Sequence, residues 1–439
     1  MSRPERYLRA LARMAEVNTV FAAAALSVLA DRLGLRRLRA FLRGRPRPEP
    51  LPGPLALRLA LQRLGPTWIK FGQLAASSTG FLPEAYAAEL ARLLDEVPPE
   101  PFAIVRRAIE EDLGAPLEKL FAEFDPVPLA AASIAQVHAA RLQDGTDVVL
   151  KVQRPGLAEI VERDMHHMRM ITRTLETLIP VVRLAHATRQ VEDLRTQLGE
   201  EMDFGLEAEH MERFSLIQKE LGNDDIVVPR LYRAFSTRRV LTMERLYGIK
   251  ISDFDRIRRE VPDSESVLLR GVRAWMQAFA LYGFFHGDVH AGNFLLLPGR
   301  RIGYLDFGIM GKFDAASRDR IFRYMQAFVT ADVAGLVAPL QEMGAIPAGT
   351  RVEDVIHDLE ELYAPFFTRH YRDIRYEEIF PAFMRRAARH GWSFPREFTL
   401  LTKQMLYFDR YAKALAPDVN LFTDRRVVSF LHDAMAAAG

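Results

Sequence analysis

The spacing of apolar residues changes along the chain and divides it into helical and strand-forming stretches. From residue 55 to about residue 120, and again after Asp314, apolar residues recur at every third or fourth position, as in amphipathic helices. Between residues 121 and 313 lie short apolar runs of the kind that form strands, at 148–152, 240–243, 294–297 and 302–305. Strands in the middle of a mostly helical chain predict an α+β fold.

The first 43 residues form a basic segment in which leucines recur at helical spacing. Leu35, Leu38 and Leu42 alternate with arginines, and the eleven arginines up to Arg47 face only four acidic residues. This pattern is typical of a helix at a membrane surface, and equally of a helix that packs on the protein with a solvated basic face. Residues 44–54 then carry five prolines and two glycines, which predicts a stiff linker.

Composition narrows the classes of protein that remain. Among 439 residues, 59 basic and 57 acidic side chains leave a net charge of +2, so nothing favours a nucleic-acid partner. Cysteine is absent, which excludes disulfides, thiolate metal sites and a cysteine nucleophile. The best apolar stretch, residues 20–30, ends at Asp31 and is about half as long as a membrane-spanning helix. We therefore expect a cytoplasmic protein, with peripheral contact to lipid on the inner face of the membrane left open.

Two acidic motifs in the strand-forming region carry the chemistry. Asp288 and Asn293 are five residues apart in the run His-Gly-Asp-Val-His-Ala-Gly-Asn, and Asp306 opens a D-F-G after two apolar runs. A turn between these runs predicts a hairpin that brings Asn293 and Asp306 to one site for Mg²⁺ or Mn²⁺. Asp288 would then be the carboxylate beside an attacking hydroxyl. The order and spacing match the catalytic loop and metal-binding motif of kinases.

Lysine is scarce in this chain, with eight among the 59 basic residues, so a lysine inside a motif is informative. Lys151 lies in the apolar run 148–152, where a kinase places the lysine that binds nucleotide phosphates. Shortly before this run the chain reads Ala-Ala-Ala-Ser-Ile-Ala-Gln, from Ala130 to Gln136. Read alone, the alanines predict the start of a helix. Their position favours a stiff loop that covers the nucleotide in place of a glycine-rich one.

Together with two further motifs, these residues resemble the UbiB-type atypical kinases, also called the AarF or ADCK family. The alanine loop, the run Lys-Val-Gln-Arg-Pro-Gly at 151–156, and the Asp288 and Asp306 motifs occur in the family's order. The run Lys70-Phe71-Gly72-Gln73 resembles the family's K-x-G-Q motif, and Glu201-Met202-Asp203 resembles its E-x-D motif. The resemblance extends from about residue 65 to residue 421.

The resemblance implies a two-lobed protein-kinase-like fold that binds ATP or ADP with Mg²⁺ or Mn²⁺. It implies a basic segment with its linker (1–54), a helical K-x-G-Q extension (55–120), an N-lobe with inserted helices (121–246) and a helical C-lobe (247–439). It assigns Asp288, Lys151 and Glu207 to catalysis, with Glu207 as the partner of Lys151, and it assigns Asn293 and Asp306 to the metal. The nucleotide contacts that it implies are Ala130, Ala131, Ala132, Ser133, Gln136, Lys151, Glu244 and Leu246.

For function, the resemblance implies a Mg-dependent ATPase or atypical kinase that supports the biosynthesis of ubiquinone or a related lipid. Adenine nucleotide and quinone-biosynthesis proteins are the partners that it implies. The K-x-G-Q segment would block protein substrates and regulate the site. Its residues would be Lys70 and Gln73, with Glu201 and Asp203 of the E-x-D motif as partners.

The sequence departs from the family in the catalytic loop, where both prolines of H-A-D-P-H-P-G-N are replaced. This loop also resembles the H-G-D-x-H-x-x-N loop of choline and aminoglycoside kinases, so a small-molecule phosphotransferase is an alternative. A nucleotide-binding pseudokinase scaffold is a second alternative, which the retention of all the catalytic and metal residues disfavours. A metal pair of His286 and His290 at helical spacing is disfavoured because Gly287 and Gly292 interrupt a helix there.

Overall fold

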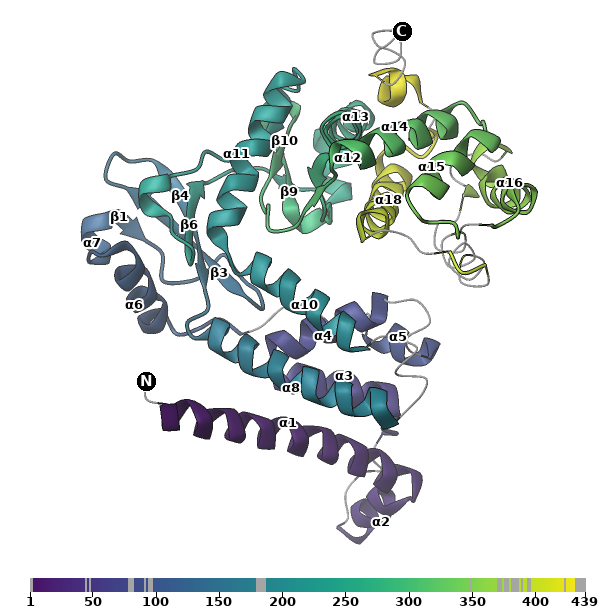
Figure 1. Cartoon of the computed structure of the whole chain (residues 1–439). Helices are drawn as coiled ribbons and strands as arrows, with labels where there is room; N and C mark the ends of the chain where they lie inside the picture. The colour runs from purple at the N-terminus through teal and green to yellow at the C-terminus, as the bar shows by residue number, and fades with distance from the viewer. Residues whose placement is uncertain are drawn as a thin grey trace. The chain divides into compact units, whose positions relative to one another are not determined.

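The computed structural model describes residues 3–43, 46, 49–77, 83–90, 92–93, 98–178, 187–347, 349–368, 373–374, 379, 387, 390–392, 396–421 and 424–430. The chain divides into two compact units, each with helices and a sheet (Figure 1). The first comprises Met1–Gly205 and Tyr232–Thr242, and the second comprises Leu206–Leu231 and Met243–Gly439. Helices and mainly antiparallel sheets confirm the predicted α+β class. The four segments expected from the sequence are a finer division and stay a prediction.

The first unit contains a five-stranded sheet in the order β1-β3-β4-β6, with β2 paired to β3. Its strands are β1 Phe121–Phe124, β2 Ala130–Ala131, β3 Ala135–Leu142, β4 Asp147–Gln153 and β6 Val240–Glu244. The turn between β3 and β4 contains Gly145 at φ 87°, a conformation that other residues rarely adopt. Val148 and Leu150 of β4 pack in one core with Val105 and Ile109 of α6, Phe102–Leu113, which the short α7, Leu117–Leu120, follows.

Six described helices of the first unit build a second apolar core: α1 Arg3–Arg32, α3 Gly53–Leu64, α4 Pro66–Ser77, α5 Glu84–Leu90, α8 Leu157–Leu178 and α10 Ala187–Glu201. α1 runs along α3 and α8 (Figure 1). Arg13 fixes it there by donating to both carboxylate oxygens of the fully buried Asp164, at 2.8 and 2.9 Å, and to the backbone O of Leu64. Val17 and Val20 of the same helix are buried in the core.

The far end of α1 and the following α2, Leu35–Leu42, expose apolar side chains. Leu33, Leu38, Phe41 and Leu42 are 54% to 81% exposed, and no residue of α2 is buried. Within the 22-residue stretch Leu11–Arg32, an 18-residue window has a mean hydropathy of 1.3, and the helix is long and apolar enough to cross a membrane, judged by length and composition only. The sequence shows no uninterrupted apolar run here, because charged residues interrupt the stretch. Only the average over many residues is apolar.

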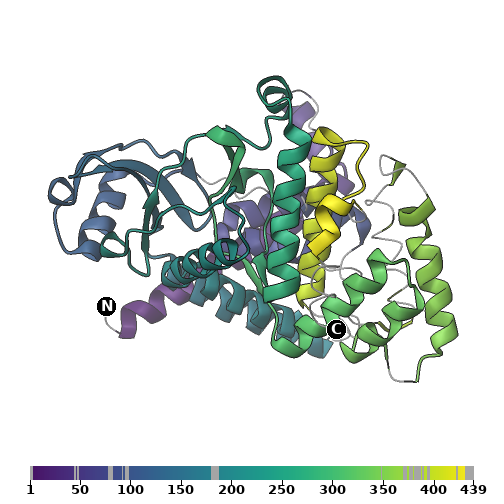
Figure 2. The same ribbon diagram turned by 90° about the horizontal axis from the view of Figure 1, so that it is seen from above.

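The second unit contains a four-stranded sheet in the order β5-β10-β9-β7 and a two-stranded sheet, β8 with β11. The strands are β5 Ile226–Val227, β7 Ile249–Lys250, β8 Phe284–His286, β9 Phe294–Leu297, β10 Arg301–Tyr304 and β11 Met310–Lys312. The helices are α11 Phe204–Glu220, whose first residues belong to the first unit, α12 Phe254–Glu260, α13 Ser264–Tyr282, α14 Ala315–Val329, α15 Val337–Glu342, α16 Val352–Thr368 and α18 Arg396–Leu415. α13 and α18 lie side by side (Figure 2).

An aromatic core in the second unit holds β8 in place. The ring of Trp275 on α13 meets Phe285 of β8 and Phe408 of α18 edge-on, with centroids 5.4 and 5.1 Å apart. Phe279, one turn after Trp275, meets Phe285 in the same way at 5.2 Å. Such pairs add specific geometry to the burial of apolar area. The end of β8, where the candidate catalytic loop begins, is therefore fixed by packing from two helices.

Candidate active site

The loop after β8 carries Asp288, and His286 fixes its backbone. His286 is 1% exposed, and its Nδ1 accepts a hydrogen bond from the backbone N of Asp288 at 3.2 Å. Its Nε2 binds the backbone O of Asp306. A carbonyl can only accept, so Nε2 carries the proton and the ring is neutral. Burial lowers the pKa of His286 below its ordinary value of 6.5, against smaller opposing effects of Asp306 and Asp288. His286 thus joins the Asp288 loop to the D-F-G segment.

The predicted hairpin is formed by β9 and β10, in which Phe294 pairs with Tyr304. One step beyond this pair, the backbone N of Leu305 donates to the O of Asn293 at 2.9 Å, so Asn293 and Asp306 lie at the same end of the hairpin. The side-chain Nδ2 of Asn293 donates to the backbone O of Asp288 at 3.0 Å. The sequence motif and the hairpin therefore bring these three residues together within the second unit.

The oxygens of Asn293 and Asp306 are of the type that Mg²⁺ prefers. Asp306 is oriented by the backbone N of Gly308, which donates to Oδ1 at 2.8 Å. In the part of the chain that the structure describes, no three His, Asp or Glu side chains form a cluster that could hold a metal. Two protein ligands suit Mg²⁺, because this ion usually completes its octahedron with phosphate oxygens and water. The residues therefore fit a metal that binds together with a nucleotide.

Helix α11 binds the D-F-G segment on both sides of Phe307. The buried Glu207 accepts a hydrogen bond from the backbone N of Phe307 at 3.2 Å. One turn later, Nδ1 of His210 donates to the backbone O of Phe307 at 3.0 Å, and burial lowers the pKa of His210. The predicted pairing of Glu207 with Lys151 joins residues of different units and stays a prediction. Within its own unit, Glu207 orients the segment that carries Asp306.

Helix α18 also binds the loop that carries Asp288. Lys403 Nζ lies 3.0 Å from Oδ1 of Asp288, and the neighbouring Gln404 binds the residues on either side of Asp288. Its Nε2 donates to the O of Gly287 at 2.7 Å, and its Oε1 accepts from the N of Val289 at 2.8 Å. The hydroxyl of Tyr411 donates to the O of Val289 at 2.6 Å. No motif in the sequence marks these residues of α18 as part of the site.

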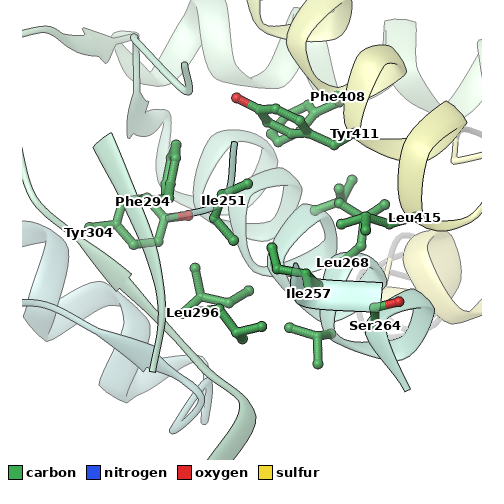
Figure 3. Close-up of a pocket in the computed structure, with 14 residues that line it drawn as sticks. Ile251, Ile257, Ser264, Leu268, Phe294, Leu296, Tyr304, Phe408, Tyr411 and Leu415 are labelled. Carbon is green, nitrogen blue, oxygen red and sulfur yellow. The ribbon is translucent and has the colours of Figure 1, made fainter. Parts of the chain in front are cut away.

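An apolar cavity of about 60 Å³ lies between the β9–β10 hairpin and helices α12, α13 and α18 (Figure 3). Figure 3 shows Phe294 and Tyr304 on the hairpin side and Tyr411 and Leu415 on α18. Phe294 directly follows Asn293, and Tyr304 lies two residues before Asp306. The cavity therefore adjoins the hairpin strands next to Asn293 and Asp306, the candidate metal ligands.

In the first unit, the alanine run forms a strand and a turn instead of a helix. Ala130 and Ala131 pair with β3, and the backbone N of Ala132 donates to the O of Ala135 at 2.8 Å to close the turn. Arg154, just after β4, is buried and fixes this turn, because its Nε donates to the O of Ala132 at 2.9 Å. The same guanidinium binds the O of Pro98 and the carboxylate of Glu100, both at 2.8 Å.

Lys151 lies on β4 opposite Val137 of β3, as expected for a strand lysine next to the alanine turn. Its Nζ is 5.3 Å from the centre of the Phe204 ring. Gln153, two residues later, donates to the backbone O of Met202 at 2.7 Å. These contacts fix Met202 of the E-x-D motif and the following Phe204 against the strand that carries Lys151.

The K-x-G-Q and E-x-D motifs meet within the first unit. Lys70 Nζ on α4 is 3.5 Å from Oε2 of Glu201 on α10, and the two side chains are only 16% and 9% exposed. Gln73, one turn after Lys70, donates to the backbone O of Leu93 at 3.1 Å. A Cβ on Gly72 would lie 2.4 Å from a methyl of Leu93, so the motif glycine allows close packing. Glu201 pairs with Lys70, and Asp203 binds Arg238 at 2.8 Å and the N of Gly205. A contact between Asp203 and Lys70 stays a prediction.

The structure also describes four further residues that are predicted to contact nucleotide. Gln136 is buried, accepts from the N of Glu100 at 2.8 Å and contacts Nε2 of His138 at 2.8 Å. Glu244 accepts from the N of Arg230 through its side chain at 3.1 Å. Leu246 packs against Gly303 of β10. Buried Ser133 follows the alanine turn. The nucleotide contacts of all these residues stay predictions.

A model of the ABC1 atypical kinase-like domain matches residues 92–339, which include every motif described above except K-x-G-Q. The chain belongs to the UbiB/AarF family of ABC1 atypical kinases. The two-lobed kinase-like fold that the resemblance implied is thereby confirmed. Within this family, the Asp288, Asn293 and Asp306 cluster is the candidate catalytic end of the second unit.

Relatives match over most of the chain. An uncharacterised chloroplastic aarF domain-containing protein kinase of Arabidopsis thaliana is 35% identical over 402 residues, 86% of this chain and 74% of its own. A probable protein kinase UbiB of Pseudomonas aeruginosa is 33% identical over 370 residues, 83% and 69% of the two chains. A complex of Mycobacterium tuberculosis Rv3197 with erythromycin has a TM-score of 0.54 and 23% identity, and covers 82% of this chain and 92% of its own. That likeness shows the fold alone.

We predict that acid destabilises this ABC1-family chain through buried neutral histidines. The pKa of His286 is lowered, so below pH 6.5 the unfolded chain takes up a proton that the folded chain refuses. Each pH unit below 6.5 should then cost about 1.4 kcal/mol of unfolding free energy until the folded-state pKa is reached. His286→Gln should flatten the fall of the melting temperature between pH 7.5 and 5. An unchanged slope would mean that His286 titrates normally in the folded protein.

Proposed function

We propose that the chain is a Mg-dependent ATPase or atypical kinase. The observation that carries this proposal is the grouping of Asp288, Asn293 and Asp306 at one end of the β9–β10 hairpin. Asp288 would accept the proton of the attacking hydroxyl or water. Asn293 and Asp306 would hold Mg²⁺, which neutralises charge on the phosphates of ATP. In the first unit, Lys151 and the alanine turn are the groups proposed to bind phosphate.

The biological role that we propose is support of ubiquinone or related isoprenoid-quinone biosynthesis, at a membrane and with other proteins of that pathway. This part rests on the resemblance to UbiB-type kinases, and relatives named probable protein kinase UbiB agree with it. We propose a cytoplasmic protein bound peripherally to the inner face of the membrane. The exposed apolar and basic surface of α2 supports the membrane contact.

A second candidate is a phosphotransferase that acts on a small hydroxylated molecule, which the His-Gly-Asp-Val-His sequence of the loop favours. The K-x-G-Q motif argues against it, because that motif is not expected in choline or aminoglycoside kinases. Its pairing with the E-x-D motif through Lys70 and Glu201 supports the UbiB-type proposal, in which this segment restricts protein substrates.

We predict that ATP stabilises the protein only when Mg²⁺ or Mn²⁺ is present, and that Asp306→Ala abolishes this stabilisation. Loss of one ligand from a charged metal site should weaken nucleotide binding by several kcal/mol. Thermal-shift measurements with and without metal test this. Asp319→Ala is the matched control, because it removes an exposed carboxylate of the same unit that pairs with Arg323. Equal shifts in Asp306→Ala and wild type would remove Asp306 from the metal site.

We predict that Lys70→His raises autophosphorylation and fails to restore quinone content in cells that lack the gene. At neutral pH the histidine is mostly uncharged, so Glu201 would be left nearly buried without its lysine, at a cost on the order of 3 kcal/mol. Lys119→His, at an exposed lysine of α7, is the control and should behave as wild type. Asp306→Asn should also fail to restore quinone, but without autophosphorylation. Full restoration by Lys70→His at a wild-type rate would contradict a regulatory role.

We predict reversible, salt-sensitive binding to anionic vesicles through the exposed end of α1 and α2. Each basic residue near an anionic surface contributes about 1 kcal/mol, and the exposed leucines and Phe41 add apolar burial. Replacing Leu38, Phe41 and Leu42 together by Gln should abolish flotation with the vesicles. The control replaces the equally exposed Leu216 of α11 by Gln. Membrane binding that resists both high salt and carbonate extraction would indicate a spanning helix instead.

A further inference from the structure

We infer that Lys403 on α18 is a catalytic residue that supplies a positive charge to the phosphoryl group during transfer. The inference rests on the proposed phosphoryl-transfer function and adds a residue from the C-terminal part of the chain to its site. The observation behind it is the 3.0 Å contact between Lys403 Nζ and Oδ1 of Asp288, within the second unit.

The position of Lys403 is set by its neighbour. Gln404 is fully buried and binds the O of Gly287 and the N of Val289, the two residues that flank Asp288. Consecutive residues of one helix therefore bind three consecutive residues of the loop. This register fixes where the lysine stem leaves the helix, and the contact with Asp288 follows from it. An accidental surface pair has no such support.

The loop that carries Asp288 offers a bound phosphoryl group no positive side chain of its own. The loop from His286 to Asn293 contains no lysine or arginine. Oδ2 of Asp288 faces Nε2 of His290 at 3.5 Å, whereas Oδ1 faces Lys403. The side chain of Lys403 is 49% exposed and that of Asp288 20%, so the ammonium group lies where a ligand can reach it. A transferring phosphoryl group spreads negative charge over its oxygens and is stabilised by a fixed cation.

The proposed step transfers the terminal phosphoryl group of ATP to a hydroxyl group or to water. The oxygen of the attacking hydroxyl or water forms a bond to the terminal phosphorus of ATP, and its proton passes to the Asp288 carboxylate. The bond from that phosphorus to the bridging oxygen breaks, and its electron pair leaves with ADP. Lys403 donates a hydrogen bond to an oxygen of the phosphoryl group during this step and remains protonated. An ammonium point charge with three rotatable donors suits a group whose oxygens move.

The alternative is an ordinary half-exposed ion pair, whose removal would change neither turnover nor binding. A second lysine of the same helix provides the matched comparison. Lys413 Nζ pairs with Asp409 on α18 at 2.9 Å, and we assign it no part in the site. Lys403→Met and Lys413→Met therefore remove the same charge from the same helix. Melting temperatures of the ligand-free variants show whether each remains folded.

Turnover and binding are measured on the full chain with Mg²⁺. Lys403→Met should lower kcat for ATP hydrolysis or autophosphorylation roughly 100-fold and raise KM for ATP about 10-fold. It should also weaken a non-hydrolysable ATP analogue about 10-fold while ADP binds as in wild type, because only the analogue has the terminal phosphate. Lys403→Arg should recover part of both effects. Lys413→Met should match wild type in both measurements.

The outcomes separate this inference from the proposed function. If wild type turns over no faster than Asp288→Asn, the proposed activity fails, and the difference between analogue and ADP binding still decides the role of Lys403. Faster turnover in Lys403→Met would mean that the lysine blocks Asp288, and would overturn the inference. Unchanged kcat, or equal loss of analogue and ADP binding, would overturn it as well.

Discussion

The candidate site of the second unit depends on hydrogen bonds between side chains and the backbone of two irregular segments. Residues 286–289 and 306–307 lie outside helices and largely outside strands, yet several of their polar groups are buried and need partners. Gln404, Tyr411, His286, Glu207 and His210 supply these partners from α18, α11 and the end of β8. Each buried group left without one would cost about 1–3 kcal/mol.

The hairpin and helix α18 support different parts of the candidate site. The hairpin brings Asn293 next to Asp306, because both lie at one end of two paired strands, and Glu207 and His210 of α11 hold the segment after Asp306. The direction of the Asp288 carboxylate is set instead by Gln404 on both sides of it and by His286. Asp288, the proposed proton acceptor, therefore depends on α18 in addition to the bonds that join it to Asn293 and His286. A change in α18 should displace Asp288 more than the two proposed metal residues.

The part of the site that could be predicted is the part that is local in sequence. Asp288, Asn293 and Asp306 lie within 19 residues, and their spacing around two apolar runs was enough to predict the hairpin. Lys403 and Gln404 lie about 115 residues further along the chain, on a helix with ordinary spacing, so no local pattern marked them. The scarcity of lysine was the one available signal. The alanine run shows the opposite case, since its helix propensity gives way to pairing with β3 and to the hydrogen bond from Arg154.

Arginine and lysine occupy different kinds of position in this chain. Arg13 and Arg154 each bind several oxygens at once in buried positions, where a planar fork with five donors can satisfy a carboxylate and carbonyls together. Lys70, Lys151 and Lys403 occupy positions in or beside the kinase motifs, where the proposed roles call for a single compact charge. Arginine cannot replace lysine there without changing the number and direction of the donors. In a chain in which arginine is the commoner cation, the proposed roles would account for lysine at these three positions.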